Sequence, residues 1–406
     1  MSKKKEILLI SQVFYPDQVA VSNLFTKLFE RIAKYDEYAI SVWCAQPSYT
    51  TRERQPKFRE YNAINIHYLP STNFPKDSLL GRLLNVASFT LSVILKLIFG
   101  RTDDLIVVHT TPPLLAILVI GIAKLKRKRV IYVLMDIFPD GLIRLGKTSL
   151  RNPLIKLWKL FHRNAILKSE RVVAIGRDMA NWVKEEVPKI PDYKLRFIPL
   201  WQDERLIAPV EFSKNPFVLK HSLSNYFVVQ FSGNMGLWND METVGRAVAH
   251  NVDGVKFVFI GDGIRKRELL HAINGNTDKC LFFPFLSNED YANSVTACHC
   301  GLVTLRPEAV GMGVPSKIFG IMAAGIPVLA VAPRNSEIAL IVKESECGLV
   351  VEPGNFKGLV DCFVFLKEND DIRKRMGLNA RKSFERSYTI TKGVDNYLNL
   401  FNELLL

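Results

Sequence analysis

A segment near residue 315 carries the side chains best suited to hold a phosphate group. A glycine-rich turn leads into Pro315, Ser316 and Lys317, and we expect a helix over residues 316–324 followed by a buried strand over 327–331. Proline is favoured at the first position of a helix, and Ser316 can cap it. Unpaired amides at a helix start carry partial positive charge, and Lys317 adds a full one. The segment predicts a phosphate site, although an ordinary loop–helix–strand unit explains it equally well when it is taken alone.

A second glycine-containing turn follows the strand expected over residues 226–231. Gly233 and Gly236 allow the backbone to approach a ligand, and Asn234 tolerates unusual backbone dihedrals. We expect this turn at the same sheet edge as Lys317, where it would face the phosphate. The alternative is a tight strand-to-helix turn without a ligand.

A third turn, with Gly261 and Gly263, follows the strand expected over residues 255–261. It lacks the third glycine of a dinucleotide fingerprint, since Lys266 stands at that position. A glycine pair alone is a weak signal, so contact with a base or ribose and simple packing both remain open.

Two carboxylates, Asp136 and Asp140, follow the strand expected over residues 129–134. A carboxylate at the end of a strand can receive a proton from a substrate hydroxyl, whereas an aspartate can also cap a helix. His109 ends another expected strand, where it would be either a site residue or a packed core histidine.

The elements that must position these residues alternate between strand and helix along the chain. One set ends near residue 200, an irregular stretch reaches Pro216, and a second set begins near residue 226. Alternation of this kind predicts parallel sheets covered by helices on both faces, hence two doubly wound α/β domains. Ligands of such sheets lie at the carboxyl ends of the strands, and we expect them in a cleft between the domains.

The positive charge of the chain is concentrated in its first half. The net charge is +14, and residues 1–200 hold 32 Lys and Arg against 17 Asp and Glu, whereas residues 201–406 hold 22 against 23. This half requires an anionic partner such as nucleic acid, anionic lipid or a diphosphate-linked substrate. A nucleic-acid-binding protein is one alternative, but no aromatic residues interleave with the basic ones and no nucleic-acid motif is present.

The six cysteines show no CxxC spacing, and we expect no metal site. In Cys298-His299-Cys300, strand alternation would put the two thiols on one face and the ring on the other. A reducing cytoplasm fits this usage best. The first residues lead directly into a strand over 7–10, so we expect no signal peptide.

Two apolar segments resemble membrane spans, but we expect neither to cross a membrane. Residues 79–99 are interrupted by Arg82, Asn85 and Lys96, and residues 114–123 fall short of the roughly 20 that a span requires. Leucines and isoleucines of the first segment recur with helical spacing. The stripe is either the core-facing side of a helix or the side of a helix that lies in a bilayer interface. Its members are Leu79, Leu80, Leu83, Leu84, Ala87, Leu91, Ile94, Leu95 and Ile98.

Taken together, these motifs resemble the retaining GT-B glycosyltransferases of family four. The resemblance is to the bacterial branch that builds surface polysaccharides and includes proposed fucosamine transferases. The motifs span nearly the whole chain in the expected order. They are Tyr15-Pro16, Thr111-Pro112-Pro113-Leu114, Asp136-Ile137-Phe138-Pro139-Asp140, Ile198-Pro199-Leu200-Trp201-Gln202-Asp203, Ser232-Gly233-Asn234-Met235-Gly236, Gly261-Asp262-Gly263, Val314-Pro315-Ser316-Lys317 and Ala323-Ala324-Gly325-Ile326-Pro327-Val328.

The resemblance implies two Rossmann-like domains: residues 1–205 for the acceptor and 206–388 for a nucleotide-sugar, with a helix over 389–406 crossing back to the first domain. It implies transfer of a sugar, an N-acetylated or deoxy hexosamine, from a UDP-sugar to a lipid-diphosphate-linked acceptor in capsule, O-antigen or exopolysaccharide synthesis. We expect a cytoplasmic enzyme, peripheral on the inner face of the plasma membrane at an anionic surface, that needs no metal or further cofactor and binds no nucleic acid. A nucleotide-sugar epimerase with the same fold is the other enzymatic alternative.

In this interpretation Asp136 and Lys317 are the catalytic residues, Asp136 polarising the acceptor hydroxyl and Lys317 holding the donor phosphates. The expected donor contacts are Gly233, Asn234, Gly236, Gly261, Gly263, Ser316 and Lys317.

The chain departs from the family's usual pattern at several positions. The family's two glutamates, eight positions apart, would fall on Met312 and Gly320, and Glu308 could replace one of them. Other departures are Val19-Ala20 at the usual glycine pair, Asn234 and about Asp240 at the usual Arg and Lys, and Met135 at the usual cleft histidine.

Overall fold

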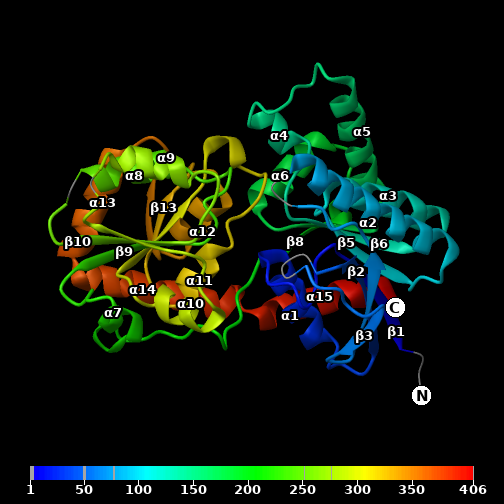
Figure 1. Cartoon of the computed structure of the whole chain (residues 1–406), viewed down its shortest axis with the longest axis horizontal. Coiled ribbons are helices and arrows are strands. Elements are labelled where there is room, and N and C mark those ends of the chain that lie inside the picture. The colour runs from blue at the N-terminus through cyan, green and yellow to red at the C-terminus, as the bar shows by residue number, and fades with distance from the viewer. Residues whose placement is uncertain (1–3, 49–51, 76–77, 251, 276, 406) are drawn as a thin grey trace. The chain divides into compact units, whose positions relative to one another are not determined.

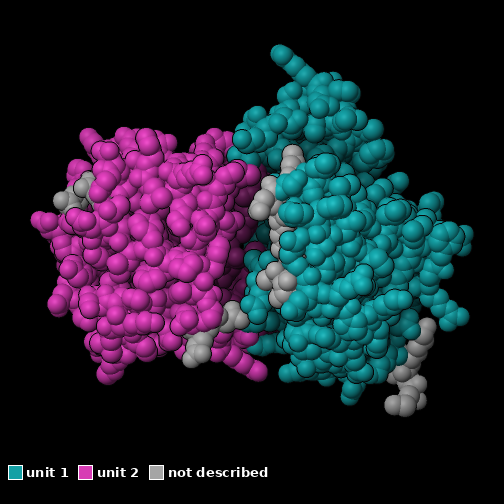
Figure 2. Space-filling model, in the orientation of Figure 1, with its two compact units in different colours: residues 1–199, 393–406 teal, residues 200–392 magenta. Residues whose placement is uncertain are grey.

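The computed structural model describes residues 4–48, 52–75, 78–250, 252–275 and 277–405 of the 406-residue chain. The chain divides into two compact units, unit 1 with residues 1–199 and 393–406 and unit 2 with residues 200–392 (Figure 2). Each unit is built on its own sheet, as the alternation of strands and helices predicts.

The sheet of unit 1 has the strand order β3-β4-β2-β1-β5-β6-β7-β8 in the described part of the chain. Every pair is parallel except β3 with β4. The strands β1, β5 and β6 are apolar and largely buried, as expected for strands covered on both faces. The bounds are β1 Lys5–Ile10, β2 Tyr38–Gln46, β3 Phe58–Tyr61, β4 Ile64–Pro70, β5 Leu105–His109, β6 Arg129–Leu134, β7 Arg171–Ala174 and β8 Leu195–Phe197.

Helices cover both faces of this sheet. The chain passes from β1 to β2 in one direction and from β5 through β8 in the other, so right-handed crossovers place α1 and α3 on opposite faces. The helix α3 packs against both α2 and α5 (Figure 1). The bounds are α1 Ala20–Ile32, α2 Leu79–Phe99, α3 Pro113–Leu125, α4 Asp140–Arg144, α5 Pro153–Lys168 and α6 Arg177–Glu186.

The last helix, α15 (Ile390–Leu405), packs on unit 1 through its C-terminal part. The ring of Phe401 lies edge-on to Tyr38, with ring centroids 6.2 Å apart. The side-chain oxygen of Asn402 accepts hydrogen bonds from Lys5 Nζ at 2.9 Å and from the Tyr38 hydroxyl at 2.7 Å. These contacts join the end of the chain to the first two strands. Leu406 lies outside the described residues.

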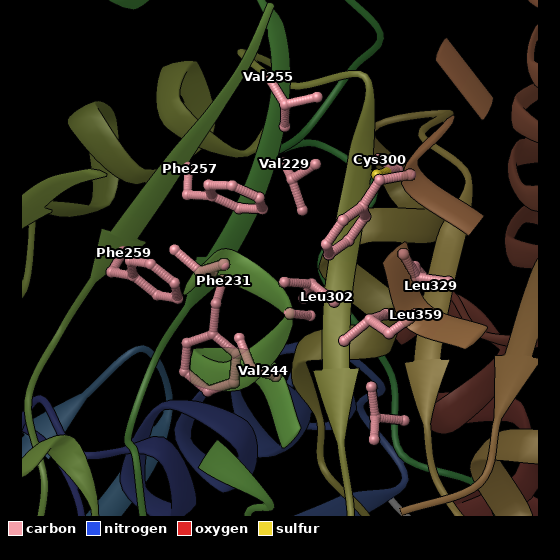
Figure 3. Close-up of a cluster of buried hydrophobic side chains, with 14 of the residues drawn as sticks. Val229, Phe231, Val244, Val255, Phe257, Phe259, Cys300, Leu302, Leu329 and Leu359 are labelled. Carbon is pink, nitrogen blue, oxygen red and sulfur yellow. The ribbon is translucent and has the colours of Figure 1, made fainter. Parts of the chain in front are cut away.

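The sheet of unit 2 is parallel throughout, with the order β11-β10-β9-β12-β13-β14 in the described residues. Phe231, Phe257, Phe259 and Leu302 interdigitate in a fully buried core on one face (Figure 3). The strands are β9 Phe227–Ser232, β10 Val255–Ile260, β11 Cys280–Phe283, β12 Cys300–Thr304, β13 Val328–Val331 and β14 Gly348–Val351. The helices are α7 Pro216–Lys220, α8 Met241–Ala249, α9 Lys266–Ile273, α10 Asn288–Val295, α11 Lys317–Ala323, α12 Glu337–Glu344, α13 Phe356–Glu368 and α14 Asp370–Ser387.

Strand β3, which was not predicted from the sequence, pairs antiparallel with β4 at the edge of the first sheet. Asn62 and Ala63 join the two strands, and both have positive φ values of 50° and 62°. Two consecutive positive φ values are typical of a type I′ hairpin. The usual sequence signal for that turn is Asn-Gly. Here Ala63 stands at the glycine position, so the turn could not be recognised from the sequence.

Candidate functional site

Two loops of unit 2 meet at the carboxyl edge of its sheet. They follow the adjacent parallel strands β9 and β10. The Gly233 N–H donates to the Ile260 carbonyl at 2.9 Å, and the Met235 N–H donates to the Asp262 carbonyl at 2.8 Å. Residues 233–236 and 261–263 therefore form one connected platform, which we call the glycine platform.

The two glycines of the second loop are required by packing within this platform. Gly261 and Gly263 have φ values of +111° and +150°. A Cβ atom on Gly261 would lie 2.4 Å from the Gly233 carbonyl oxygen, and one on Gly263 would lie 2.4 Å from the Met235 carbonyl oxygen. Packing of the two loops thus accounts for both glycines, and their contact with a base or ribose stays a prediction.

The first loop lies directly beside Lys317. Gly233 has a φ value of +122°, and a Cβ atom there would lie 3.5 Å from Lys317 Cε. The Asn234 carbonyl accepts a hydrogen bond from Lys317 Nζ at 3.3 Å. The Gly236 N–H donates to Asn239 Oδ1 at 2.8 Å, which fixes the far end of the loop. The structure thus brings Lys317 together with the residues expected to contact the donor.

The ammonium group of Lys317 lies in an unusual environment. It is 3.6 Å from the centre of the Phe231 ring, a cation–π contact. Desolvation lowers the pKa of Lys317 to about 7. An anion bound next to it would restore the charge, because a nearby opposite charge favours the protonated form.

The start of α11 differs from what the sequence predicts. Ser316 has helical dihedrals (φ −63°, ψ −16°), and its side chain accepts no capping hydrogen bond, so the capping prediction is wrong. The N–H of Phe319 donates to the Ser316 carbonyl at 3.1 Å, and the N–H of Ile318 to the Pro315 carbonyl at 3.4 Å. A tight first turn therefore occupies two of the amides that we expected to be unpaired. Ser316 itself is exposed and adjoins Lys317.

A tyrosine lies where the family's second glutamate would stand. A Cβ atom on Gly320 would lie 2.4 Å from the hydroxyl oxygen of Tyr291, a residue of α10. Burial raises the pKa of Tyr291 to about 12, and its hydroxyl hydrogen-bonds with Gln202. No motif in the sequence points to Tyr291, which is 29 positions before Gly320. Met312, at the other glutamate position, is fully buried.

Glu308, which we considered as a replacement carboxylate, is paired with an arginine. Arg306 Nε donates to Glu308 Oε2 at 3.2 Å. Hydrogen bonds from its own backbone and from Arg306 outweigh desolvation and hold the pKa of Glu308 below its ordinary value. Glu308 therefore stays ionised at neutral pH.

In unit 1, Asp136 follows β6 and has the properties of a proton acceptor. The hydroxyl oxygen of Thr110 accepts hydrogen bonds from the N–H groups of Met135 and Asp136, each at 3.0 Å, which positions the loop. Burial raises the pKa of Asp136 to about 6. Among the residues that the structure describes, its carboxylate has no hydrogen-bond or ion-pair partner. A carboxylate with a pKa near neutral suits general-base chemistry.

Asp140 and His109 are occupied by structural contacts instead. Asp140 is buried and forms an ion pair with Lys159 Nζ at 2.5 Å. His109 Nε2 lies 2.8 Å from Ser11 Oγ, and its Nδ1 accepts a hydrogen bond from the Thr111 N–H. Complete burial lowers the pKa of His109 to about 3. Both residues connect elements of unit 1, which favours their structural interpretations.

The loop after β1 is held by side-chain hydrogen bonds. Helix α1 has Val19 as its N-cap residue and no side-chain cap. Ser22 Oγ donates to the Asp17 carbonyl at 2.8 Å. The Asp17 carboxylate in turn accepts a hydrogen bond from Ser48 Oγ at 2.6 Å.

No group of three or more His, Cys, Asp or Glu residues that could hold a metal ion occurs within the described ranges. His299 Nδ1 accepts a hydrogen bond from the Val228 N–H at 3.0 Å, and its ring stacks on Phe227. The ring is therefore held by contacts within unit 2.

Comparison with known proteins finds a family match within the second unit. Residues 217–383 match the model of the family described as "Glycosyl transferases group 1". The chain is 29% identical over 260 residues to the probable glycosyltransferase WbjE of Pseudomonas aeruginosa, covering 63% of this chain and 64% of WbjE. It is 25% identical over 318 residues to the putative colanic acid biosynthesis glycosyl transferase WcaI of Escherichia coli, covering 74% of this chain and 76% of WcaI.

Among solved structures, Anabaena Alr3699/HepE in complex with UDP and glucose aligns with a TM-score of 0.74, covering 98% of this chain and 100% of that one. The identity of that pair is 15%, so the similarity speaks for the fold alone. The two parallel α/β sheets and these neighbours give the GT-B fold that the sequence predicts. The chain accordingly has the GT-B fold, and its residues 217–383 are similar to the glycosyl transferases group 1 family.

Proposed function

We propose that the protein transfers a sugar from a UDP-sugar to a lipid-diphosphate-linked acceptor during synthesis of a bacterial surface polysaccharide. The observation that carries this proposal is the position of Lys317 beside the glycine platform in a group 1 domain. The HepE complex with UDP and glucose supports the choice of donor, and the colanic acid name of WcaI supports the class of product. The resemblance noted above favours an N-acetylated or deoxy hexosamine as the sugar, with capsule, O-antigen or exopolysaccharide as the product.

In this proposal the glycine platform and Lys317 bind the diphosphate of the donor. The ammonium group offers a charge-assisted hydrogen bond to a phosphate oxygen, and exposed Ser316 offers a hydroxyl beside it. Anion binding restores the proton that desolvation disfavours on Lys317. The contact between the Lys317 ammonium group and the diphosphate becomes stronger as the leaving diphosphate gains negative charge. It therefore stabilises the transition state more than the ground state and lowers the activation barrier of the transfer.

Asp136 acts on the acceptor. The acceptor oxygen forms a bond to the anomeric carbon of the sugar, while the bond from that carbon to the diphosphate oxygen breaks and its electron pair leaves with UDP. The Asp136 carboxylate accepts a hydrogen bond from the attacking hydroxyl, polarises it and takes up its proton as the new bond forms, for which its pKa of about 6 is suitable. Lys317 neutralises the released diphosphate.

A transfer assay with the purified full-length protein tests this proposal. A panel of UDP-sugars is incubated with polyprenyl-diphosphate glycans, and products are identified by mass spectrometry. We expect one sugar to be added from a UDP donor, with loss of activity in Lys317→Ala. An isomerised nucleotide-sugar formed from donor alone would instead identify an epimerase. Failure of every uridine, guanosine and adenosine diphosphate to raise the melting temperature would contradict nucleotide binding itself.

A further inference from the structure

The apolar stripe of α2 faces outward. Leu80, Leu91 and Leu95 are 66%, 56% and 47% exposed, so the core-facing interpretation of this stripe is wrong. The opposite side of the helix is in the core, where Phe89 and Val93 are fully buried. The other strongly exposed apolar residues of α2 are Leu83, Leu84, Ile98 and Phe99.

Two neighbouring helices continue this apolar surface. On α3, which packs against α2, the outward residues Leu114, Leu118 and Leu125 recur at helical spacing and are exposed. On α5, which packs against α3 (Figure 1), the exposed apolar residues follow the same pattern. They are Leu154, Leu157, Leu160 and Phe161, with Leu150 just before the helix. We call the outward faces of these helices the α2–α3–α5 surface.

The charge of this region has a single sign. The segments 79–102, 112–129 and 141–169 contain three, five and seven Lys and Arg residues and no Asp or Glu. Some of these bases are held by acids from other segments, such as Lys159 by Asp140. Others are exposed or partly exposed and have no ion-pair partner in the part of the chain that the structure describes. They include Arg82, Arg101, Arg127, Lys147, Arg151, Lys156 and Lys168.

We propose that the α2–α3–α5 surface docks on an anionic phospholipid bilayer. The exposed leucines and phenylalanines would enter the boundary between headgroups and acyl chains, and the unpaired Lys and Arg residues would contact the phosphate headgroups. A large exposed apolar patch on a folded protein marks an interaction site. The Lys and Arg residues around the α2–α3–α5 surface complement the negative charge of an anionic lipid surface.

In this proposal, helix α2 lies along the membrane surface and does not cross the bilayer. Residues 80–99 form a helix that is long and apolar enough to cross a membrane, by length and composition alone. However, Phe89, Val93 and Leu97 are buried in unit 1, and Ser92 Oγ donates to the Pro70 carbonyl at 2.6 Å. A helix bound to the protein along one side lies on the membrane surface with its other side in lipid.

This surface reaches the edge of the sheet that carries Asp136. In a parallel αβ unit each helix begins near the carboxyl end of the strand that precedes it. The N-terminal ends of α2, α3 and α5 therefore lie toward the same edge as Asp136, which follows β6. If the proposed function holds, a lipid-linked acceptor in the bilayer reaches Asp136 without leaving the membrane. Docking itself does not depend on that function.

Vesicle sedimentation with the full-length protein tests the docking. The probes are phosphatidylcholine vesicles with and without about 30% phosphatidylglycerol, at increasing salt. The test variant carries Leu91→Glu, Leu118→Glu and Leu157→Glu, one exposed leucine from each helix. The matched control carries Leu219→Glu, Leu270→Glu and Leu378→Glu, equally exposed leucines of unit 2. We expect the wild type and the control to bind anionic vesicles, and the test variant to bind roughly tenfold more weakly or worse.

A second pair of variants separates the contribution of charge. The test variant combines Lys147→Gln, Arg151→Gln and Lys156→Gln. We expect it to bind anionic vesicles roughly tenfold more weakly, with a weaker dependence of binding on salt. The control variant combines Lys220→Gln, Lys343→Gln and Lys392→Gln, which replace exposed lysines of unit 2. We expect it to bind as the wild type does.

Three outcomes would overturn the proposal. The first is a wild type that does not sediment with anionic vesicles, and the second is an equal loss in the leucine variant and its control. The third is lipid-independent self-association that the leucine variant abolishes, which would make a second copy of the chain the occupant. Unfolding is excluded by circular dichroism and by a thermal unfolding transition that is unchanged from wild type. Vesicle binding without any transferase activity would leave the docking intact and contradict only the proposed function.

Discussion

Lys317 Nζ lies 3.6 Å from the centre of the Phe231 ring and 3.3 Å from the Asn234 carbonyl oxygen. This places a lysine whose pKa is lowered to about 7 at the loop that follows β9. Binding of an anion next to Lys317 would therefore be accompanied by protonation of its amine. The predictions about donor binding follow from this relationship.

We predict that Lys317→Ala weakens UDP-glucose binding by about ten- to a hundredfold, because a charge-assisted hydrogen bond contributes roughly 1.5–3 kcal/mol. Lys317→Arg should retain part of the affinity. Isothermal titration calorimetry measures both, with Lys374→Ala, an exposed lysine on α14, as control. Equal affinity in Lys317→Ala and wild type would remove Lys317 from the donor site.

We predict a bell-shaped pH profile for kcat/KM, which reports the pKa values of the free enzyme. Asp136 must be ionised, so activity falls as the pH drops below about 6. Lys317 must be protonated, so activity also falls as the pH rises above about 7. Lys317→Arg should lose the alkaline limb and keep the acid limb. A profile that is flat between pH 5 and 8.5 would contradict both assignments.

We predict that Asp136→Asn lowers kcat by about 10²- to 10⁴-fold and leaves binding of UDP-glucose in unit 2 unchanged. It should also stabilise the protein at pH 7. The folded-state pKa of Asp136 is raised, so the stability that its protonation provides is lost as the pH rises through about 6. Asparagine does not ionise, so the Asp136→Asn variant keeps this part of its folding stability at pH 7. Thermal unfolding at pH 5 and 7 measures the difference, and a variant that is less stable than wild type at pH 7 argues against a buried, unpaired carboxylate.

Gly261→Ala tests the packing of the glycine platform. Alanine at this position has a positive φ, and its Cβ would lie 2.4 Å from the Gly233 carbonyl oxygen, which is backbone and cannot easily move. The matched control is Gly354→Ala, with φ +87° and no atom within 4 Å of the added Cβ. We expect roughly 1 kcal/mol of destabilisation in the control and about 3 kcal/mol or more in Gly261→Ala, measured by urea unfolding. Equal losses would mean that the two loops are not packed as described.

The sequence was sufficient to predict elements whose signals are local. Buried strands followed by glycine turns identified β9, β10 and their loops, and strand order brought those loops together. The direction of the α2 stripe was not predictable, because Phe89, Val93 and Leu97 make the inner side of that helix apolar as well. Periodicity gives the faces of a helix but does not say which face meets the sheet.

Contacts between distant residues account for most of what the sequence did not predict at the candidate site. Their position after a strand does not separate Asp136 from Asp140, and the choice of Asp136 came from the family resemblance. In the structure, Lys159 pairs with Asp140 and leaves Asp136 as the carboxylate with the raised pKa. Similarly, only the fold brings the Tyr291 hydroxyl to Gly320. Tertiary contacts of this kind leave no pattern in neighbouring residues.

Proton uptake on donor binding tests the central claim most directly. Calorimetric titration of UDP-glucose at pH 8, in buffers with different ionisation enthalpies, counts the protons taken up. With a free pKa of about 7, Lys317 is mostly neutral at that pH, so wild type should take up most of one proton and Lys317→Arg close to none. UDP-glucose binding to wild type without proton uptake would contradict the claim that Lys317 meets the donor diphosphate.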